Sequence, residues 1–272
     1  MPSIDLNAPP PAEFFEPVNC YLCGSSDRAH FETAQEDLTG KPGDFTFVTC
    51  TDCGLVYQHP RLTIDHIKDY YDDEYIAHRK EQSWGYLTPF FEWLMSKLDR
   101  DKDAIVADTC KLDAQSMVLD VGCGAGGFLA HIQKRYGSQC VGVDFKDLSE
   151  VIQTLNTDGK IDFKCGTLAE VDLPPKSFDL ITMWHFLEHD YDPLETLKVA
   201  RSLLKPGGQI VIEVPRLDSV SHSLYRDRWP GWQAPQHTVA LDKECFLRMM
   251  DLAGLEVTDY LPYGAYPGYF YM

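Results

Sequence analysis

The chain has 272 residues, of which 44% are hydrophobic and 24% are charged, and its formal net charge at pH 7 is −18. This composition is typical of a globular protein, and the length suits one large and one small domain with a sizeable buried core. The negative charge disfavours nucleic acids and anionic membranes as partners, because the sequence has no cluster of Lys and Arg to offset it.

The N-terminal stretch and the cysteine count indicate the compartment. The start of the chain, MPSIDLNAPPPAEFFEP, lacks the basic residues and apolar run of a signal peptide. No stretch of the sequence reaches the about 18 apolar residues that a membrane span needs. The nine cysteines are an odd number in a chain without an export signal. This combination predicts reduced thiols and a cytoplasmic location.

Two Cys-x-x-Cys-Gly units stand near the N-terminus, one with Cys20 and Cys23 and the other with Cys50 and Cys53. Two turns of this kind present four thiolates tetrahedrally to Zn²⁺, and the glycine after each pair suits the tight backbone. Two redox-active pairs are the alternative, although neither pair lies in a thioredoxin-like βαβ pattern. Four protein ligands leave no open coordination position, so we predict a structural zinc ribbon over residues 1–60.

The charge of this N-terminal segment bears on RNA binding. Residues 1–60 contain two basic residues and nine acidic ones. A zinc module that binds RNA is expected to be basic, so this segment is a poor candidate for that role.

Helical spacing of apolar residues follows over residues 61–112, which we expect to form a helical connector. From residue 116, short runs rich in Val, Ile and Phe alternate with helical segments ended by glycine. Alternating β and α units of this length predict a parallel sheet with helices on both faces. Residues 242–254 then show an amphipathic helical pattern, and residues 255–263 are expected to form a strand. The aromatic ending indicates either a truncated chain or a short edge strand.

Residues 118–129, VLDVGCGAGGFL, combine a strand, a glycine turn and the start of a helix. Glycines let the backbone approach a ligand whose anionic group faces the N–H groups of the helix start. Both dinucleotides and S-adenosylmethionine use this arrangement. Asp120 favours the second ligand, because its carboxylate suits the ammonium group of the methionine part and would repel a pyrophosphate. Asp144, at the end of the next strand, can hold the ribose hydroxyls of either ligand.

The glycine loop is followed in order by KCGTLAEVDLP (164–174), FDLITMWHFLEHDYDP (178–193) and LKPGGQIVIEVP (204–215). This series resembles the class I S-adenosylmethionine-dependent methyltransferases over roughly residues 115–260. The resemblance implies an α/β fold with a Rossmann-like, seven-stranded, mostly parallel sheet and S-adenosylmethionine as the cofactor. The residues that it implies for cofactor binding are Tyr75, Asp120, Gly122, Cys123, Gly124, Gly126, Asp144, Phe145, Gly166, Thr167, Leu168, Trp184 and His185.

The resemblance assigns these residues to different parts of the cofactor. Asp120 and the loop glycines would hold the methionine end, while Asp144 and Phe145 would hold the ribose and flank the adenine. Tyr75 lies in YYDDEYIAHR (70–79), which is similar to a Tyr-rich segment that covers the cofactor in zinc-bearing members. We therefore expect Tyr75 to act as a cofactor lid, with packing of a helix face on the core as the alternative.

Methyl transfer from a sulfonium needs an aligned nucleophile, the exclusion of water and, where the acceptor's proton is not acidic, a base. His189 lies in WHFLEH, a segment that faces the acceptor in this family, and His237 lies in a loop that can fold over the site. We predict that His189 or His237 is the base, and a packed or capping histidine is the alternative for each. Trp229 and Trp232 of the second loop could wall a pocket.

A closer resemblance is to bacterial methyltransferases with an N-terminal zinc-binding domain, on the Cys pairs, YYDDEYIAHR, WHFLEH and the PQH…F…MMDLAGLEV end. The expected parts are a zinc ribbon (1–60), a helical connector and cofactor lid (61–112) and a methyltransferase domain (113–272). We predict methyl transfer to a small molecule, such as a sugar or natural-product intermediate, with structural Zn²⁺ and no nucleic-acid or membrane partner. The alternatives are an RNA methyltransferase and a non-catalytic cofactor-binding scaffold, while Asp120 disfavours a dehydrogenase.

Overall fold

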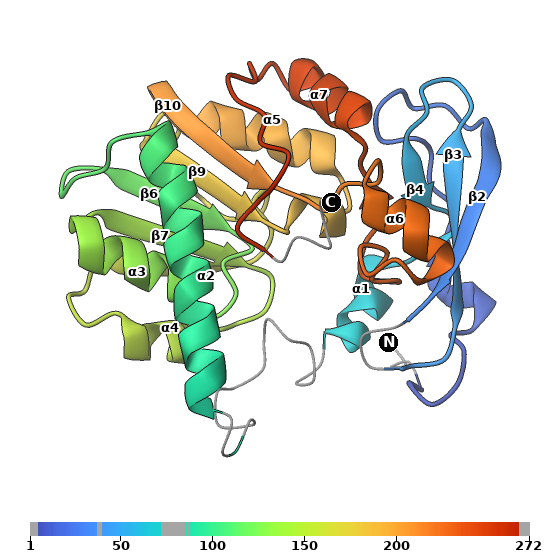
Figure 1. Cartoon of the computed structure of the whole chain (residues 1–272), viewed down its shortest axis with the longest axis horizontal. Coiled ribbons are helices and arrows are strands. Elements are labelled where there is room, and N and C mark those ends of the chain that lie inside the picture. Colours follow the sequence, from blue (N-terminus) through green and yellow to red (C-terminus); the bar gives the residue numbers. More distant parts are fainter. Residues whose placement is uncertain (1–4, 37–39, 72–84, 86–87, 267–272) are drawn as a thin grey trace.

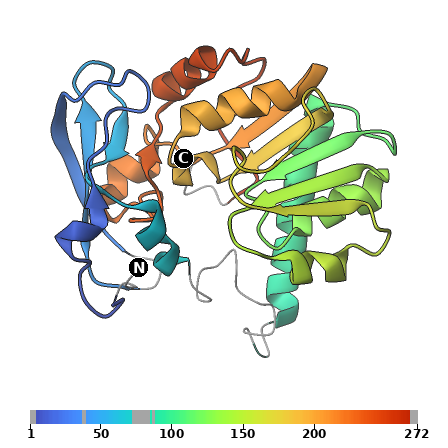
Figure 2. The same ribbon diagram turned by 180° about the vertical axis from the view of Figure 1, so that it is seen from behind.

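The computed structural model describes residues 5–36, 40–71, 85 and 88–266 of the chain (Figure 1). Two bodies lie side by side in both views of the ribbon (Figures 1 and 2). The smaller body is an antiparallel sheet built mainly from the N-terminal part, and the larger is a parallel sheet with helices. None of the described helices is long and apolar enough to cross a membrane.

The parallel sheet has five strands in the described part of the chain, in the order β10-β9-β6-β7-β8. These strands are β6 (Met117–Val121), β7 (Gln139–Asp144), β8 (Ile161–Cys165), β9 (Phe178–Trp184) and β10 (Leu204–Glu213). Every neighbouring pair is parallel, which confirms the predicted α/β fold with a Rossmann-like sheet. The strand order reverses beside β6, and sheets of this type bind ligands at the carboxyl ends of the strands at such a switch point.

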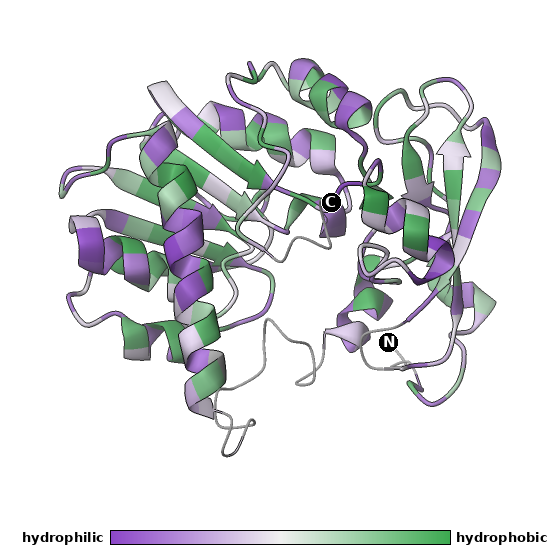
Figure 3. Cartoon of the chain, in the orientation of Figure 1, coloured by the Kyte–Doolittle hydropathy of each residue, from purple (hydrophilic) through white to green (hydrophobic). Residues whose placement is uncertain are grey.

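Helices cover both faces of this sheet, as expected. α2 (Thr88–Thr109), α3 (Gly127–Tyr136) and α4 (Ser149–Leu155) share one apolar core with the sheet, and α5 (Pro193–Leu203) and α7 (Lys243–Leu252) share another. α7 begins after Asp242, whose side chain accepts a hydrogen bond from Cys245 N at 2.7 Å. Figure 3 shows mainly hydrophobic strands and helices of mixed character. This pattern is typical of strands buried on both faces beneath amphipathic helices.

Residues 255–263, which we expected to form a strand, have no regular secondary structure. The side chains of Val257, Leu261 and Tyr263 are 37%, 46% and 65% exposed. Strand preference depends on burial of one face against neighbours, so apolar and β-branched residues alone do not produce a strand here. The described sheet therefore has five strands, whereas the resemblance implies seven.

The antiparallel sheet has the order β11-β4-β3-β2. β2 (Arg28–Gln35), β3 (Asp44–Cys50) and β4 (Val56–Gln58) come from the N-terminal segment, whereas β11 (Val239–Ala240) comes from much later in the chain. Val239 pairs with Tyr57 and Ala240 pairs with Val56 in an antiparallel arrangement. The chain after β10 therefore completes the N-terminal sheet and joins the two bodies.

The core of the smaller body is aromatic. Trp229 and Trp232 are fully buried and belong to one apolar cluster with Phe45, Phe47 and Tyr70. The two tryptophans therefore fill a core and do not wall an open pocket. The remaining short elements are η1 (Ala12–Phe14), β1 (Phe15–Glu16), β5 (Arg61–Leu62), α1 (Ile64–Ile67), η2 (Lys68–Tyr70), η5 (Leu187–His189), α6 (Val220–Tyr225) and η6 (Arg226–Arg228).

Candidate functional site

Four cysteine thiols converge in the smaller body. The Sγ atoms of Cys20 and Cys53 are 3.3 Å apart, and those of Cys23 and Cys50 are 3.5 Å apart. All four sulfur atoms lie within 4.8 Å of one another, and none is in a disulfide. A tetrahedral site with Zn–S bonds of about 2.3 Å has sulfur atoms about 3.8 Å apart. The four thiols therefore fit a Zn²⁺ ion.

The backbone around these thiols forms two equivalent turns. Gly24 N donates a hydrogen bond to Cys20 O, and Gly54 N donates one to Cys50 O, both at 2.9 Å. The φ angles of Gly24 and Gly54 are +72° and +82°, which residues with a side chain rarely adopt. The glycine after each Cys pair is thus required by the conformation of its turn.

The predicted glycine loop joins β6 to α3 at the carboxyl end of the parallel sheet. Gly122 and Gly126 have φ angles of +72° and +79°. A Cβ atom on Gly122 would lie 2.5 Å from Cδ2 of Phe186, so this position excludes a larger residue. Gly122 N donates to Val143 O at 2.8 Å, which ties the loop to β7. The loop has the tight backbone through which such turns approach an anionic ligand.

Asp120 is the last but one residue of β6 and is 3% exposed. Its Oδ1 accepts a hydrogen bond from Thr182 Oγ1 at 2.7 Å. Burial raises the pKa of Asp120 to about 7, although the nearby Lys102 acts in the opposite direction. A buried carboxylate in this position gains stability from a cationic ligand group placed beside it.

Asp144 ends β7 and is buried beside the glycine loop. Its Oδ2 accepts from Gly124 N and its Oδ1 accepts from Lys146 N, both at 3.0 Å. Burial raises the pKa of this carboxyl group above its usual value. The next residue, Phe145, is exposed, and its ring centre lies 5.0 Å from that of Tyr71. The predicted ribose and adenine residues are therefore held at the carboxyl edge of the sheet.

The predicted adenine edge follows β8. Gly166 has a φ angle of +143°, in the region that favours glycine. The N and Oγ1 atoms of Thr167 donate to Glu170 Oε2 at 2.9 and 2.8 Å. Thr167 is exposed, whereas Leu168 is buried in the core. Thr167 can therefore contact a ligand, whereas Leu168 anchors this segment to the core.

Other predicted cofactor residues occupy different surroundings. A Cβ atom on Gly142 would lie 2.7 Å from Cys123 Sγ, so the side chain of Cys123 packs against β7. Trp184 ends β9 and makes an edge-to-face contact with Phe128 at 5.4 Å between ring centres. Tyr75 lies outside the residues that the structure describes.

Lys102, which we did not predict, projects from α2 toward the same region. Its Nζ lies 5.3 Å from the ring centre of Trp184, 5.7 Å from that of Phe128 and 5.2 Å from that of Tyr266. Burial favours the neutral amine, but surrounding groups that include Asp120 raise the pKa of Lys102 overall. A buried ammonium group therefore lies close to the buried Asp120 carboxylate, and its place in a helical pattern gives no sequence signal.

A buried ion pair follows β9. His185 Nδ1 lies 3.0 Å from Glu188 Oε1, and His185 Nε2 lies 3.5 Å from Glu213 Oε1. Burial opposes a charged His185, but the two carboxylates raise its pKa to about 9. Burial likewise disfavours ionised Glu188, but His185 brings its pKa down to about 2. His185 is therefore a fixed cation. Glu213 also accepts hydrogen bonds from the backbone of residues 265–266.

The two predicted bases are neighbours, with ring centres 4.4 Å apart. His189 Nδ1 lies 3.2 Å from Gln236 O, and His237 Nδ1 lies 2.8 Å from Gly231 O. A carbonyl oxygen only accepts, so each Nδ1 carries the proton and each Nε2 has the lone pair. Burial lowers the pKa of His189, and it lowers that of His237 to about 3. Tyr71 OH lies 3.0 Å from the same His189 Nδ1, and in this tautomer its oxygen is a second acceptor of that N–H group.

Glu188, His189 and His237 also have potential ligand atoms within 4.8 Å of one another. A metal ion is one way to use such a set. The contact of 3.0 Å between His185 and Glu188 already supplies a cation to this carboxylate. The ion pair balances the charge of Glu188, but both of its buried oxygens lack a hydrogen-bond partner among the described residues.

Comparisons with known proteins agree on the class of domain. A family model described as a methyltransferase domain matches residues 90–260. The ubiquinone biosynthesis O-methyltransferase of Idiomarina loihiensis is 34% identical over 149 residues, which are 51% of this chain and 61% of that protein. The protein of the same name from Vibrio cholerae is 39% identical over 97 residues, which are 34% of this chain and 39% of that protein. The chain thus matches less than two thirds of these relatives.

One solved structure supports the fold, and a second is similar to part of the chain. A chain of the complex that contains the Haloferax volcanii Trm112 methyltransferase activator has a TM-score of 0.51 and 18% identity, over 61% of this chain and 73% of that one. A SAM-dependent methyltransferase from Aquifex aeolicus has a TM-score of 0.49 and 20% identity, over 60% of this chain and 85% of that one. The first of these likenesses, at 18% identity, supports the arrangement of the sheet and helices alone.

Proposed function

Because the chain belongs to the methyltransferase domain family, we propose that it transfers the methyl group of S-adenosylmethionine to an oxygen atom of a small molecule. The observation that carries this proposal is the pair of buried carboxylates at the ends of β6 and β7 around the glycine loop. Asp120 is 3% exposed and Asp144 is 6% exposed. Two buried acids at a switch point suit a ligand with one cationic end and a ribose.

The charges around the loop match the methionine end of this cofactor. That end is a zwitterion, with an ammonium and a carboxylate group on one carbon atom. Asp120 would face the ammonium group, and Lys102 would face the carboxylate together with the N–H groups of the loop. Asp144 would accept hydrogen bonds from the ribose hydroxyls, and the exposed Phe145 would flank the adenine. The bound sulfonium supplies the methyl group and the leaving group.

The oxygen acceptor is supported by the relatives, which are named as O-methyltransferases. A hydroxyl group is a poor nucleophile until it loses its proton, so such a reaction needs a base. His189 is our candidate, because its Nδ1 is committed to Gln236 O and its Nε2 retains a lone pair. His237 is the weaker candidate, since burial lowers its pKa to about 3 and it is 2% exposed. The fixed cation His185 would hold Glu188 beside them.

The four N-terminal cysteines would hold a structural Zn²⁺ ion. Cys20, Cys23, Cys50 and Cys53 supply four thiolates, which completes a tetrahedral shell and leaves no position for a substrate. The ion would contribute to folding of the smaller body by tying its two cysteine turns together. The negative charge of residues 1–60 continues to disfavour the alternative of an RNA substrate.

Calorimetry and a transfer assay test this proposal. S-adenosylhomocysteine and NAD⁺ are titrated separately into the zinc-loaded chain, and only the first is expected to bind. Hydroxylated small molecules, including sugars and phenols, are then incubated with S-adenosylmethionine that carries a labelled methyl group. The label is expected on oxygen in the product. Binding of NAD⁺ without S-adenosylhomocysteine would exclude the proposal, and label on nitrogen or carbon alone would exclude the oxygen acceptor.

A further inference from the structure

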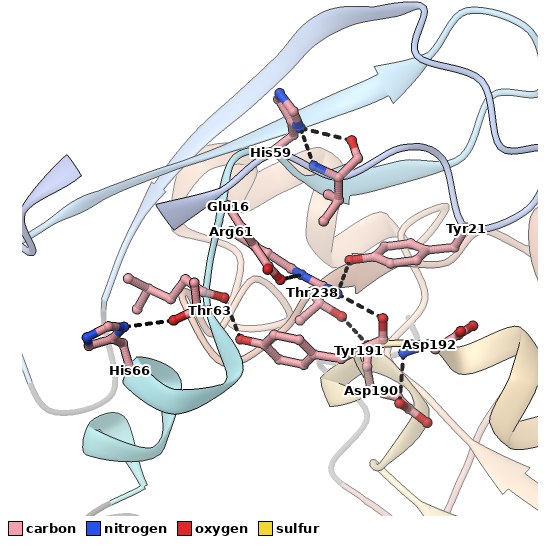
Figure 4. Close-up of polar contacts among 12 residues, drawn as sticks. Glu16, Tyr21, His59, Arg61, Thr63, His66, Asp190, Tyr191, Asp192 and Thr238 are labelled. Carbon is pink, nitrogen blue, oxygen red and sulfur yellow. Dashed lines mark hydrogen bonds and ion pairs between the residues drawn. The ribbon is translucent and has the colours of Figure 1, made fainter. Parts of the chain in front are cut away.

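Arg61 connects the cysteine-bearing part of the chain to the turn that carries His189 (Figure 4). This residue lies in β5, and its side chain is 12% exposed. Its Nη1 donates hydrogen bonds to Tyr21 OH at 2.9 Å and to Tyr191 O at 2.8 Å, and its Nε donates to Glu16 Oε1 at 2.8 Å. The guanidinium carbon also lies 4.0 Å from the ring centre of Tyr191. One buried cation thus holds groups from three segments of the chain.

One of these groups belongs to the cysteine turn itself. Tyr21 lies between Cys20 and Cys23 in the sequence. Its ring meets that of Tyr57 edge to face, with 5.6 Å between the centres. The position of the Tyr21 hydroxyl group is therefore set by the turn that would close around the metal. Arg61 depends on that position, because it donates a hydrogen bond to this hydroxyl group.

The opposite partner belongs to residues 187–191, which we call the acceptor turn. Tyr191 OH donates to Leu62 O at 2.7 Å, next to Arg61 in β5. Thr238 Oγ1 donates to Asp190 O at 2.6 Å, and Thr238 N donates to Glu188 O at 2.7 Å. Thr238 O in turn accepts from Gln58 N of β4 at 2.8 Å. The smaller body therefore holds the acceptor turn in two ways. One is direct, through Arg61 and Leu62, and the other is through Thr238, which precedes β11 of the antiparallel sheet.

We propose that the metal-bound N-terminal module positions the acceptor turn and its His189, and that Arg61 is the positioning residue that links the two. The role in catalysis rests on the proposed function. A buried guanidinium group with three acceptors in fixed directions is a rigid connection, and lysine cannot reproduce its fork. When the cysteine turn loosens, Arg61 loses the Tyr21 hydroxyl group and holds the carbonyl of Tyr191 less firmly.

Hydrogen exchange of the full, zinc-loaded chain tests the link without an acceptor. The measured amides are those of His189 and Asp190, which donate to Phe186 O at 2.9 Å and to Leu187 O at 3.3 Å. We expect about tenfold faster exchange in Arg61→Lys and a smaller increase in Tyr21→Phe, as for loss of a charge-assisted hydrogen bond. The matched control is Arg216→Lys, because the Arg216 guanidinium pairs with Asp218 at 2.8 Å and lies 5.9 Å from the ring centre of Tyr260, and neither residue belongs to the acceptor turn. This control should leave the acceptor turn unchanged.

Removal of zinc with a chelator completes a cycle. In the wild type it should speed exchange more than Arg61→Lys does, because the Thr238 contacts with the acceptor turn loosen as well. In Arg61→Lys its added effect should be smaller than in the wild type, because the Arg61 link is already broken. Affinity for S-adenosylhomocysteine should stay within about twofold throughout, since the cofactor loop is untouched. Once an acceptor is known, the kcat of Arg61→Lys should be lower than that of the wild type, while the KM for S-adenosylmethionine should stay constant.

Three results would overturn the proposal: unchanged exchange in both Arg61→Lys and Tyr21→Phe, equal acceleration in Arg216→Lys, or additive effects of zinc removal and Arg61→Lys. Failure of the proposed function looks different. In that case no acceptor is methylated by the wild type, while the exchange cycle still shows coupling between the two parts.

Discussion

Thr182 Oγ1 donates a hydrogen bond to Asp120 Oδ1 at 2.7 Å, across the neighbouring strands β9 and β6. The hydroxyl group is fully buried, and Asp120 is 3% exposed. The bond fixes the direction of a carboxylate that has little water around it. A buried acid of this kind costs free energy when ionised unless a cation lies beside it. Its position at the switch point of the sheet makes it the first residue to test.

Asp120→Asn should weaken binding of S-adenosylhomocysteine by about 30-fold, or about 2 kcal/mol, because a charge-assisted contact with the ammonium group is lost. The amide keeps the size of the side chain, so the fold should be retained. Calorimetry gives the dissociation constant. Asp179→Asn is the control, because Asp179 is partly exposed, pairs with Lys205 at 2.7 Å and accepts from Met117 N at the end of β6 opposite the loop, a bond that the asparagine oxygen can also accept. Equal affinities of Asp120→Asn and wild type would remove Asp120 from the cofactor site.

The pH dependence follows from the pKa of Asp120, which burial raises to about 7. A raised folded-state pKa means that this group stabilises the free protein when protonated, and that this contribution is lost as the pH rises through about 7. The ligand ammonium group meets the ionised form, so binding should strengthen severalfold from pH 5.5 to pH 7.5. Calorimetry at several pH values measures the change. The Asp120→Asn variant should lack this part of the pH dependence, and an identical profile would contradict the assignment.

Lys102→Met should weaken S-adenosylhomocysteine about tenfold, because the ligand carboxylate loses a buried ammonium partner. The methionine side chain is of similar length, so it should fill the space beside the rings of Trp184 and Phe128. 5′-Methylthioadenosine has the same adenosine but lacks the amino-acid part, so its affinity should not change. Competition binding of both ligands measures the difference. An equal loss of affinity for both ligands would show that Lys102 supports the pocket as a whole and does not bind the ligand carboxylate.

The repeating part of the fold was predictable from sequence because its signals are local. The β/α alternation gave the parallel sheet, since buried strands read as short apolar runs and their helices as amphipathic segments. The loop glycines were equally clear: Gly122 needs a positive φ and lies against Phe186. The four cysteines were found from spacing alone, because two identical turns present them.

The remaining features depend on contacts between distant segments. β11 pairs with β4 across more than half of the chain, and two residues such as Val239 and Ala240 carry no pattern that indicates a partner. Lys102 is one of many charged residues of α2, and nothing in the sequence distinguishes it from the others. Only the packing of α2 against the sheet places it near Asp120. The expected strand at 255–263 did not form for the same reason, because no strand in the described part of the chain pairs with it.

His189→Gln should lower kcat by about 10²- to 10⁴-fold with an oxygen acceptor, as for loss of a general base. Burial lowers the pKa of His189, so the wild-type rate should rise with pH and level off below the usual histidine value of 6.5. His237→Gln should instead act mainly on stability, because His237 is buried and donates to Gly231 O. Rate profiles and thermal unfolding separate the two effects.

Two outcomes would contradict this assignment of the base. Full activity of His189→Gln would show that another group, or the acceptor itself, releases the proton. A rate that depends on added Mg²⁺ or Zn²⁺ after removal of all metal except the cysteine-bound ion would show that Glu188, His189 and His237 hold a metal. A catalytically inactive but cofactor-binding wild type would favour the scaffold alternative.

Removal of the metal should unfold the smaller body and leave the parallel sheet intact. We expect one zinc ion per chain by elemental analysis and none in a variant with Cys23→Ser and Cys50→Ser. Because β11 pairs with β4 and Trp229 and Trp232 fill the same core, the loss of exchange protection should extend to residues 229–241. β6 and β7 should keep theirs, and cofactor affinity should persist. Loss of exchange protection in residues 15–62 alone would show that β11 and its neighbours are stable without the N-terminal strands.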